Sequence, residues 1–294
     1  MKIIVLGSGT SHGIPVVGCS CPVCTSNESK DKRMRSSIYI EGSGGERALI
    51  DAGPEFRLQA LRSGITALDG IFLTHSHADH IHGLDDVRPL SWKKPLPVYG
   101  NDQTITEMRE RFAYVFCSTA QRGGGKPNLL PRVVDGPVRI GSLTFTPVPV
   151  KHGVLDILGW EVGENASKSA VSTGKTPSER IVPSESDKSF LYLTDTSAIP
   201  PSSLKQIRPS SRRVVIIGGL RARPHETHFS FGQALEAALD LDATEAYLTH
   251  LSHDHSHAEV EAFCRRFAEG QRDSGKNLEG VTLHPAWDGL EISL

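Results

Sequence analysis

A short segment of the chain carries four side chains that can bind metal ions. Residues 75–80 read His-Ser-His-Ala-Asp-His and directly follow the apolar segment Gly70–Leu73, which favours a β-strand. Imidazole nitrogens and a carboxylate oxygen suit Zn²⁺, Mn²⁺ or Fe²⁺. Four ligands within six residues cannot all reach one ion in good geometry, but they can serve two ions about 3.5–4 Å apart. The run therefore predicts a two-metal site at the end of a strand.

The histidines of the whole chain are clustered in the same way. There are 13 of them, and eight lie within residues 75–82 and 250–257. Histidines scattered over a surface or through a core would not gather in two such short windows. We therefore expect the second window to contribute to a metal site as well.

Short apolar segments alternate with helical ones along the chain. Strands are expected at segments that include Lys2–Leu6, Thr144–Val150, Phe190–Leu193, Val214–Ile217 and Ala246–Leu248. Helices are expected at Pro54–Ser63, Thr104–Phe116, Gly232–Leu241 and Ala258–Glu269. This alternation predicts an α/β protein whose sheets are covered by helices. Since several strands end in His or Asp, their loops are expected to form a single active-site rim.

Composition excludes several classes of protein. With 32 Lys and Arg against 34 Asp and Glu, the chain has no basic field for general nucleic-acid binding. No apolar run approaches the roughly 20 residues that cross a bilayer, and the start lacks a signal-peptide pattern. We expect a cytoplasmic protein with no membrane partner. One domain is predicted over residues 1–294, with a flexible insertion at about 164–189 that is rich in Ser, Lys and Pro.

Three of the five cysteines lie within six residues, at Cys19, Cys21 and Cys24. In a reducing compartment this C-x-C-x-x-C spacing is typical of metal binding rather than of disulfides. Three thiolates leave a tetrahedral Zn²⁺ one ligand short. Cys117 and Cys264 lie in apolar helical patterns and are expected in the core.

These motifs occur in the order found in the metallo-β-lactamase-fold hydrolases, which the chain resembles over nearly its whole length. The resemblance rests on the opening strand with its Gly-rich turn, Leu49–Gly53, the histidine run, His152, Thr194-Asp195 and Thr249-His250. It implies a single-domain αββα sandwich with two divalent ions, Zn or Mn, at one edge. It also implies hydrolysis rather than redox chemistry, because the oxygen-reducing diiron branch usually carries an acidic residue at the position of His77.

The resemblance further implies a role for each residue of the centre. One ion would be held by His75, His77 and His152. The other would be held by Asp79, His80 and His250, with Asp195 bridging, and Asp79 also counts among the catalytic residues. Asp51 would orient a ligand histidine from behind.

The cysteine loop resembles that of the PhnP-type phosphodiesterases within this fold. In that family the fourth zinc ligand is a histidine three residues after the last active-site histidine. His253 takes that place here, which implies a structural zinc held by Cys19, Cys21, Cys24 and His253. His228 resembles the family's non-ligand catalytic histidine and is expected to be a general acid or a phosphate contact, with His225 as the alternative. A homodimer is also implied.

The sequence therefore predicts a dimetal phosphodiesterase that acts on a small-molecule phosphodiester, with cyclic diesters included, through a metal-bridging hydroxide. Two alternatives stay open: a thioester or lactone hydrolase that uses the same centre, and a PqqB-like metal-bound binding protein that does not hydrolyse. The tRNA-processing branch is similar around the metals but needs a basic RNA-clamping arm. No such insertion is present, so no stable nucleic-acid partner is expected.

Overall fold

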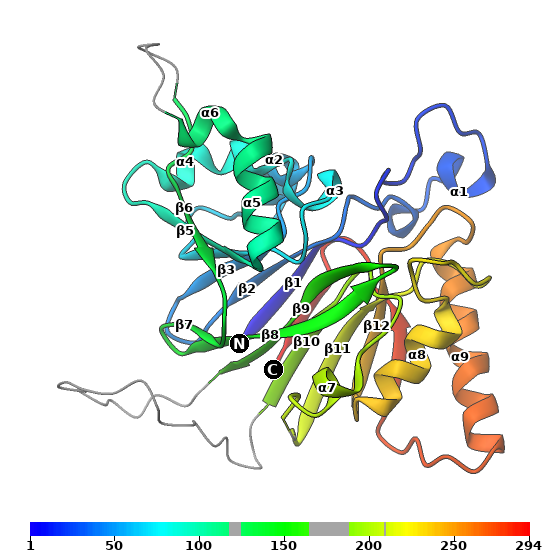
Figure 1. The fold of residues 1–294 in the computed structure, drawn as a ribbon. Coiled ribbons are helices and arrows are strands. Elements are labelled where there is room, and N and C mark those ends of the chain that lie inside the picture. The colour runs from blue at the N-terminus through cyan, green and yellow to red at the C-terminus, as the bar shows by residue number, and fades with distance from the viewer. Residues whose placement is uncertain (118–124, 165–187, 209) are drawn as a thin grey trace.

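The computed structural model describes residues 1–117, 125–164, 188–208 and 210–294. Its two seven-stranded sheets stack face to face, and helices cover both outer faces (Figure 1). This arrangement confirms the predicted single-domain αββα sandwich. The insertion predicted at about 164–189 falls almost entirely outside the described residues.

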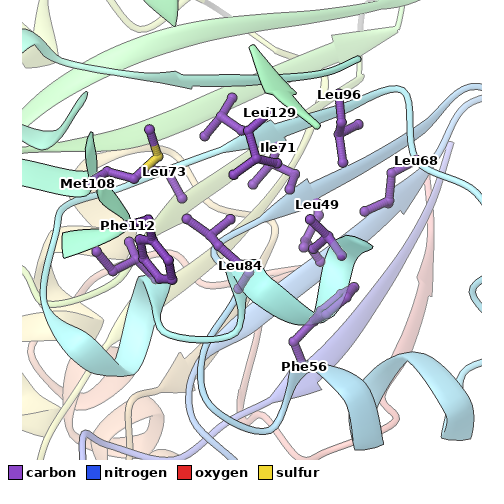
Figure 2. Close-up of a cluster of buried hydrophobic side chains, with 14 of the residues drawn as sticks. Leu49, Phe56, Leu68, Ile71, Leu73, Leu84, Leu96, Met108, Phe112 and Leu129 are labelled. Atoms are coloured by element: carbon purple, nitrogen blue, oxygen red, sulfur yellow. The ribbon is translucent and has the colours of Figure 1, made fainter. Parts of the chain in front are cut away.

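The first sheet contains the N-terminal strands and carries helices on its outer face. In spatial order its strands are β14 (Glu291–Ser293), β1 (Lys2–Gly7), β2 (Ser37–Glu41), β3 (Arg47–Ile50), β4 (Gly70–Phe72), β5 (Leu96–Gly100) and β6 (Leu129–Val133). Its side of the sandwich holds α2 (Phe56–Arg62), α3 (Ala78–Ile81), η2 (Leu84–Val87), α4 (Arg88–Ser91), α5 (Asp102–Arg111) and α6 (Ala113–Phe116). Buried side chains such as Leu49, Phe56, Ile71 and Met108 join these helices to the sheet (Figure 2).

The second sheet has the same number of strands and carries the C-terminal helices. In spatial order its strands are β13 (Thr282–Pro285), β12 (Glu245–Thr249), β11 (Arg212–Gly218), β10 (Lys188–Leu193), β9 (Leu155–Glu164), β8 (Leu143–His152) and β7 (Val138–Ile140). The remaining helices are α1 (Pro22–Thr25), η1 (Ser29–Asp31), α7 (Pro201–Leu204), α8 (Phe231–Asp240) and α9 (His257–Asp273). Helices α8 and α9 lie against this sheet (Figure 1).

The layer between the sheets is apolar and rich in aromatic rings. Phe72 of β4 stacks on Phe145 of β8, with ring centroids 3.7 Å apart, and on Tyr99 at 4.9 Å. Trp160 meets the same ring edge-on at 5.0 Å. Stacked and edge-on aromatic pairs stabilise a fold beyond the area they bury. The two sheets are therefore held in a fixed relation, which sets the positions of the loops at their edge.

Local sequence signals account for where the two long C-terminal helices begin. Ser230 and Ser256 are N-caps, and each forms a reciprocal capping box with Gln233 or Glu259. Such a box satisfies two backbone N–H groups that the first turn leaves unpaired. The helices therefore begin at Phe231 and His257, just after the loops that carry His228 and His253.

Two details of the sequence prediction are wrong. The helix expected over Thr104–Phe116 is broken at Phe112, whose φ of −108° and ψ of 38° separate α5 from α6. The chain then leaves α6 in an extended conformation at Cys117, so this thiol is exposed, whereas Cys264 in α9 is buried as expected. Within the described ranges, no helix is long and apolar enough to cross a membrane.

Candidate metal centre

The predicted metal-binding residues meet at one edge of the sandwich because they follow the ends of strands. His75 follows β4, His152 ends β8, Asp195 follows β10 and His250 follows β12. Strands β10 to β12 run parallel, so their carboxyl ends share one edge of the sheet. This is where α/β proteins place their ligands.

The backbone turns sharply where three of the site residues leave their strands. Asp51, Asp195 and His250 have φ values of 61°, 54° and 57°, in the left-handed region. Among the described residues only one further non-glycine residue, Asp242, has positive φ. Such conformations cost about 1–3 kcal/mol each and cluster at functional sites. The cost is consistent with side chains that must be aimed at a common point.

The first ligand group consists of three histidines. Candidate ligand atoms of His75, His77 and His152 all lie within 4.8 Å of one another. His152 donates from Nδ1 to the carbonyl of Thr227 at 2.8 Å, which leaves Nε2 free as a ligand. Nε2 of His75 is buried without a hydrogen-bond partner. A buried nitrogen with no partner is costly in a protein that holds nothing there, so its position fits a metal ligand.

The second ligand group combines two carboxylates with two histidines. Candidate ligand atoms of Asp79, His80, Asp195 and His250 lie within 4.8 Å of one another, and all four residues are buried. Nε2 of His80 lies 3.1 Å from an Asp79 oxygen and 3.3 Å from an Asp195 oxygen, without hydrogen-bond geometry to either. Nitrogen and oxygen atoms that lie this close without hydrogen bonds fit the coordination shell of one metal ion.

Asp195 lies next to both groups. Its Oδ1 is 3.1 Å from Nδ1 of His250 and 3.3 Å from His80, while its Oδ2 is 3.9 Å from Nε2 of His75. Oδ2 of this carboxylate thus faces the first ligand group and Oδ1 faces the second, as expected of a residue that bridges two ions.

The electrostatics prepare the carboxylates and His75 for metal binding, whereas His80 would have to release a proton when an ion binds. Burial alone would raise the pKa of Asp195, but His250 and His80 hold it well below the usual range. Burial, together with the charge of His80, keeps the pKa of His75 well below 6.5. His80 behaves in the opposite way, because Asp79, Asp195 and Asp51 overcome its burial and raise its pKa well above 6.5. The charged carboxylates and the neutral His75 are ready to bind a cation.

Asp51 lies directly behind His80. Its carboxylate accepts 2.8 Å hydrogen bonds from the backbone N–H and the hydroxyl of Thr74, and it is 2.7 Å from Nδ1 of His80. Because the carboxylate only accepts, it holds the proton of His80 on Nδ1 and turns Nε2 toward the centre. Carboxylates behind metal-binding histidines fix the ring in this way.

His228, rather than His225, contacts the centre. Its ring centroid lies 4.7 Å from that of His152 and 4.9 Å from that of His250, and its Nδ1 is buried without a partner. Burial, with help from His250, lowers the pKa of His228 to about 3. His225 is exposed and instead lines an open cavity of about 570 Å³ together with Arg221 and Thr227.

The three predicted cysteine ligands gather around His253. Their sulfurs lie 3.4 Å (Cys19), 3.5 Å (Cys21) and 3.4 Å (Cys24) from its Nδ1. A tetrahedral zinc with ordinary Zn–S and Zn–N bonds would separate S and N by about 3.6 Å. The four side chains therefore fit one zinc ion.

Sequence reasoning missed several residues that position the two sites. Thr10 and Ser36 contact the ring of His250 with their hydroxyls, at 2.9 Å and 3.3 Å. Buried Arg33 donates to the carbonyls of Ser252 and His255, at 2.6 Å and 3.0 Å, and so fixes the loop that carries His253. The Gly-Ser-Gly-Thr turn was visible in the sequence, but an isolated Arg or Ser carries no signal of such a contact.

The fold and these groups of ligands define a metallo-β-lactamase-type protein. The sequence model of the beta-lactamase superfamily domain matches residues 46–251. The chain therefore belongs to the β-lactamase superfamily.

Three further similarities cover nearly the whole chain. A protein of Porphyromonas gingivalis named octanoyltransferase is 37% identical over 99% of this chain, which spans only 51% of that protein. A crystal structure described as a new diphosphatase from the PhnP family is 33% identical, with a TM-score of 0.76 over 99% of this chain and 96% of that one. Zinc-bound PqqB from Methylobacterium extorquens shares the fold, with a TM-score of 0.74 and 15% identity over the full length of both chains.

Proposed function

We propose that this chain is a metal-dependent phosphodiesterase that cleaves small phosphodiesters, with cyclic diesters included. The observation that carries the proposal is the position of Asp195, which faces His75 with one oxygen and His80 and His250 with the other. The similarity to a diphosphatase of the PhnP family supports hydrolysis at phosphorus.

Each ligand group would hold one divalent ion. His75, His77 and His152 would hold the first, and Asp79, His80 and His250 the second, with Asp195 shared between them. Nitrogen and carboxylate ligands suit either Zn²⁺ or Mn²⁺. When bound, two such ions lower the pKa of a shared water and neutralise charge that builds on a phosphoryl group. A further zinc would be structural, held by Cys19, Cys21, Cys24 and His253.

The residues around the ligands prepare them for this role. Asp51 and the carbonyl of Thr227 occupy Nδ1 of His80 and His152, so both rings offer Nε2 to the centre. His228, with a pKa of about 3, is neutral at neutral pH. It therefore suits an N–H hydrogen bond to a phosphoryl oxygen better than the donation of a proton to the leaving group.

Turnover of bis(p-nitrophenyl) phosphate with added Mn²⁺ or Zn²⁺ tests the proposal. We expect release of p-nitrophenol by the wild-type chain and its loss in Asp195→Asn. A matched control is Asp242→Asn, which changes an exposed aspartate at a comparable φ of 55°. No release under any metal condition would favour the PqqB-like binding protein instead.

Hydrolysis of an acyl bond is the second candidate. The observation in its favour is the 37% identity to about half of a protein named octanoyltransferase. A thioester carbonyl does not need the phosphate contact that His228 would supply. A His228→Ala variant that loses phosphodiesterase activity but keeps activity on an octanoyl thioester would show that the centre serves both reactions. Turnover of the thioester alone by the wild-type chain would replace the first candidate with the second.

The other expectations from the sequence remain predictions. They are a cytoplasmic location, a homodimer and the lack of a stable nucleic-acid partner.

A further inference from the structure

A small cavity of about 220 Å³ opens beside the first ligand group, and we refer to it as the α5 pocket. One wall is formed by His75 and His77, and a second by one face of α5. Leu155 and Ile157 at the start of β9 form the third. Pockets that hold a whole small molecule usually measure about 300–1,000 Å³. The α5 pocket is therefore sized for one part of a substrate whose phosphate lies at the metal centre.

The helix that lines this pocket is bonded to the metal-binding run. The hydroxyl of Ser76, between the two histidines, donates to Glu107, and Arg111 donates to the Ser76 carbonyl. Gln103 donates to the other Glu107 oxygen at 2.9 Å. The wall is thus fixed relative to the first ligand group, as a recognition surface must be.

The charged groups of the pocket balance one another. Glu107 lies 3.4 Å from Arg111, and Asp156 lies 2.6 Å from Lys151. The hydrogen bonds from Ser76 and Gln103 lower the pKa of Glu107, so this carboxylate is ionised at neutral pH. A pocket lined by paired charges does not attract a further anion.

Its remaining hydrogen-bonding capacity suits hydroxyl groups. The amide nitrogen of Gln103 donates to Glu107, another lining residue of the pocket, and the carbonyl oxygen of Gln103 has no partner within the described part of the chain. The oxygens of Glu107 and Gln103 accept hydrogen bonds. The apolar side chains of Leu155 and Ile157 can cover the carbon skeleton of the same group.

We propose that the α5 pocket binds an uncharged, hydroxyl-bearing group esterified to the phosphate, such as a sugar or glycerol unit, and that Gln103 determines this specificity. The inference rests on the proposed phosphodiesterase function. It adds the class of substrate and a residue that selects it.

Two synthetic diesters that differ only in hydroxyl groups test the inference. They are the glyceryl and the propyl esters of p-nitrophenyl phosphate, which have the same charge and leaving group. We expect the wild-type chain to favour the glyceryl ester in kcat/KM by about tenfold, the equivalent of one or two hydrogen bonds. In Gln103→Leu the preference for the glyceryl ester should fall below about threefold because KM for that ester rises. The kcat for the glyceryl ester and the kcat/KM for the propyl ester should stay within about twofold of wild type. A matched control is Glu110→Gln, on the same helix but outside the pocket.

A binding measurement separates failure of this inference from failure of the proposed function. Calorimetry compares sn-glycerol 3-phosphate with propyl phosphate, and it needs no turnover. Tighter binding of glycerol phosphate by wild type, lost in Gln103→Leu and kept in Glu110→Gln, supports the pocket even if no diester is cleaved. Equal affinity of wild type for glycerol phosphate and propyl phosphate would overturn the inference. A preference for glycerol phosphate that survives in Gln103→Leu would overturn it as well.

Discussion

Replacing Asp51 by Asn should weaken metal binding through a change in the proton position of His80. In the wild-type protein the Asp51 carboxylate accepts three hydrogen bonds, two from Thr74 at 2.8 Å and one from His80 Nδ1 at 2.7 Å. An Asn can still accept from the Thr74 backbone N–H with its oxygen. Its NH₂ group must then face His80, and two donors cannot face each other. His80 would therefore move its proton to Nε2, the atom that lies 3.1 Å from Asp79 and faces the centre.

The size of the effect follows from what a protonated Nε2 can do. A nitrogen that carries a proton has no lone pair for a metal, so the second group keeps only three of its four ligands unless His80 returns to the other tautomer. Loss of such outer partners typically costs about 10–100-fold in metal affinity, or about 1.4–2.8 kcal/mol. The backbone is not a confounding factor, because Asn tolerates the φ of 61° at this position.

Competition with a chelator measures this affinity directly. The variant should release an active-site ion at a chelator concentration about 10–100-fold lower than wild type, while the zinc at the cysteine cluster is retained. Asp242→Asn is the matched control and should release its ions as wild type does. An Asp51→Asn protein whose metal affinity stays within twofold of wild type would refute the argument from the tautomer.

Two further predictions concern stability. Arg33→Met should lower the free energy of unfolding, measured in urea, by about 3 kcal/mol. The reason is that the carbonyls of Ser252 and His255 lose charge-assisted donors in a buried site. A loss below about 1 kcal/mol would contradict the role of Arg33 in fixing the loop that carries His253. Burial raises the pKa of Asp288 to about 6, so the folded state binds the carboxyl proton of Asp288 more tightly than the unfolded state does. The free energy of unfolding should therefore fall as the pH rises from about 4 to 6. Asp288→Asn should flatten that slope in urea titrations at several pH values, and an unchanged slope would mean that other groups cause it.

The gathering of the candidate metal ligands at one edge was predictable because each carries its chemistry in its identity and follows a recognisable strand. His75 and Asp195 each follow a buried apolar segment, so the topology of an α/β sandwich alone brings them to one edge. The cysteine loop was predictable for a related reason, since C-x-C-x-x-C places three sulfurs within reach of one ion.

The contacts that hold these residues in place could not be predicted in the same way. Glu107 and Arg111 reach Ser76 only because α5 lies beside the loop that follows β4, and Arg33 reaches residues more than 200 positions away in the sequence. Such contacts depend on how the layers pack, which local periodicity does not encode. The break at Phe112 has the same origin, because this residue is buried in the hydrophobic cluster between the first sheet and its helices.

Metal content per chain, measured by plasma emission spectroscopy on wild type and Cys21→Ser, tests the central claim most directly. The account predicts three ions in wild type, with Cys21→Ser losing one zinc selectively and keeping two. Two ions in both proteins would show that the cysteine cluster is free of metal. Fewer than two ions in wild type purified and assayed with excess Zn²⁺ or Mn²⁺ would contradict a dimetal centre at Asp195.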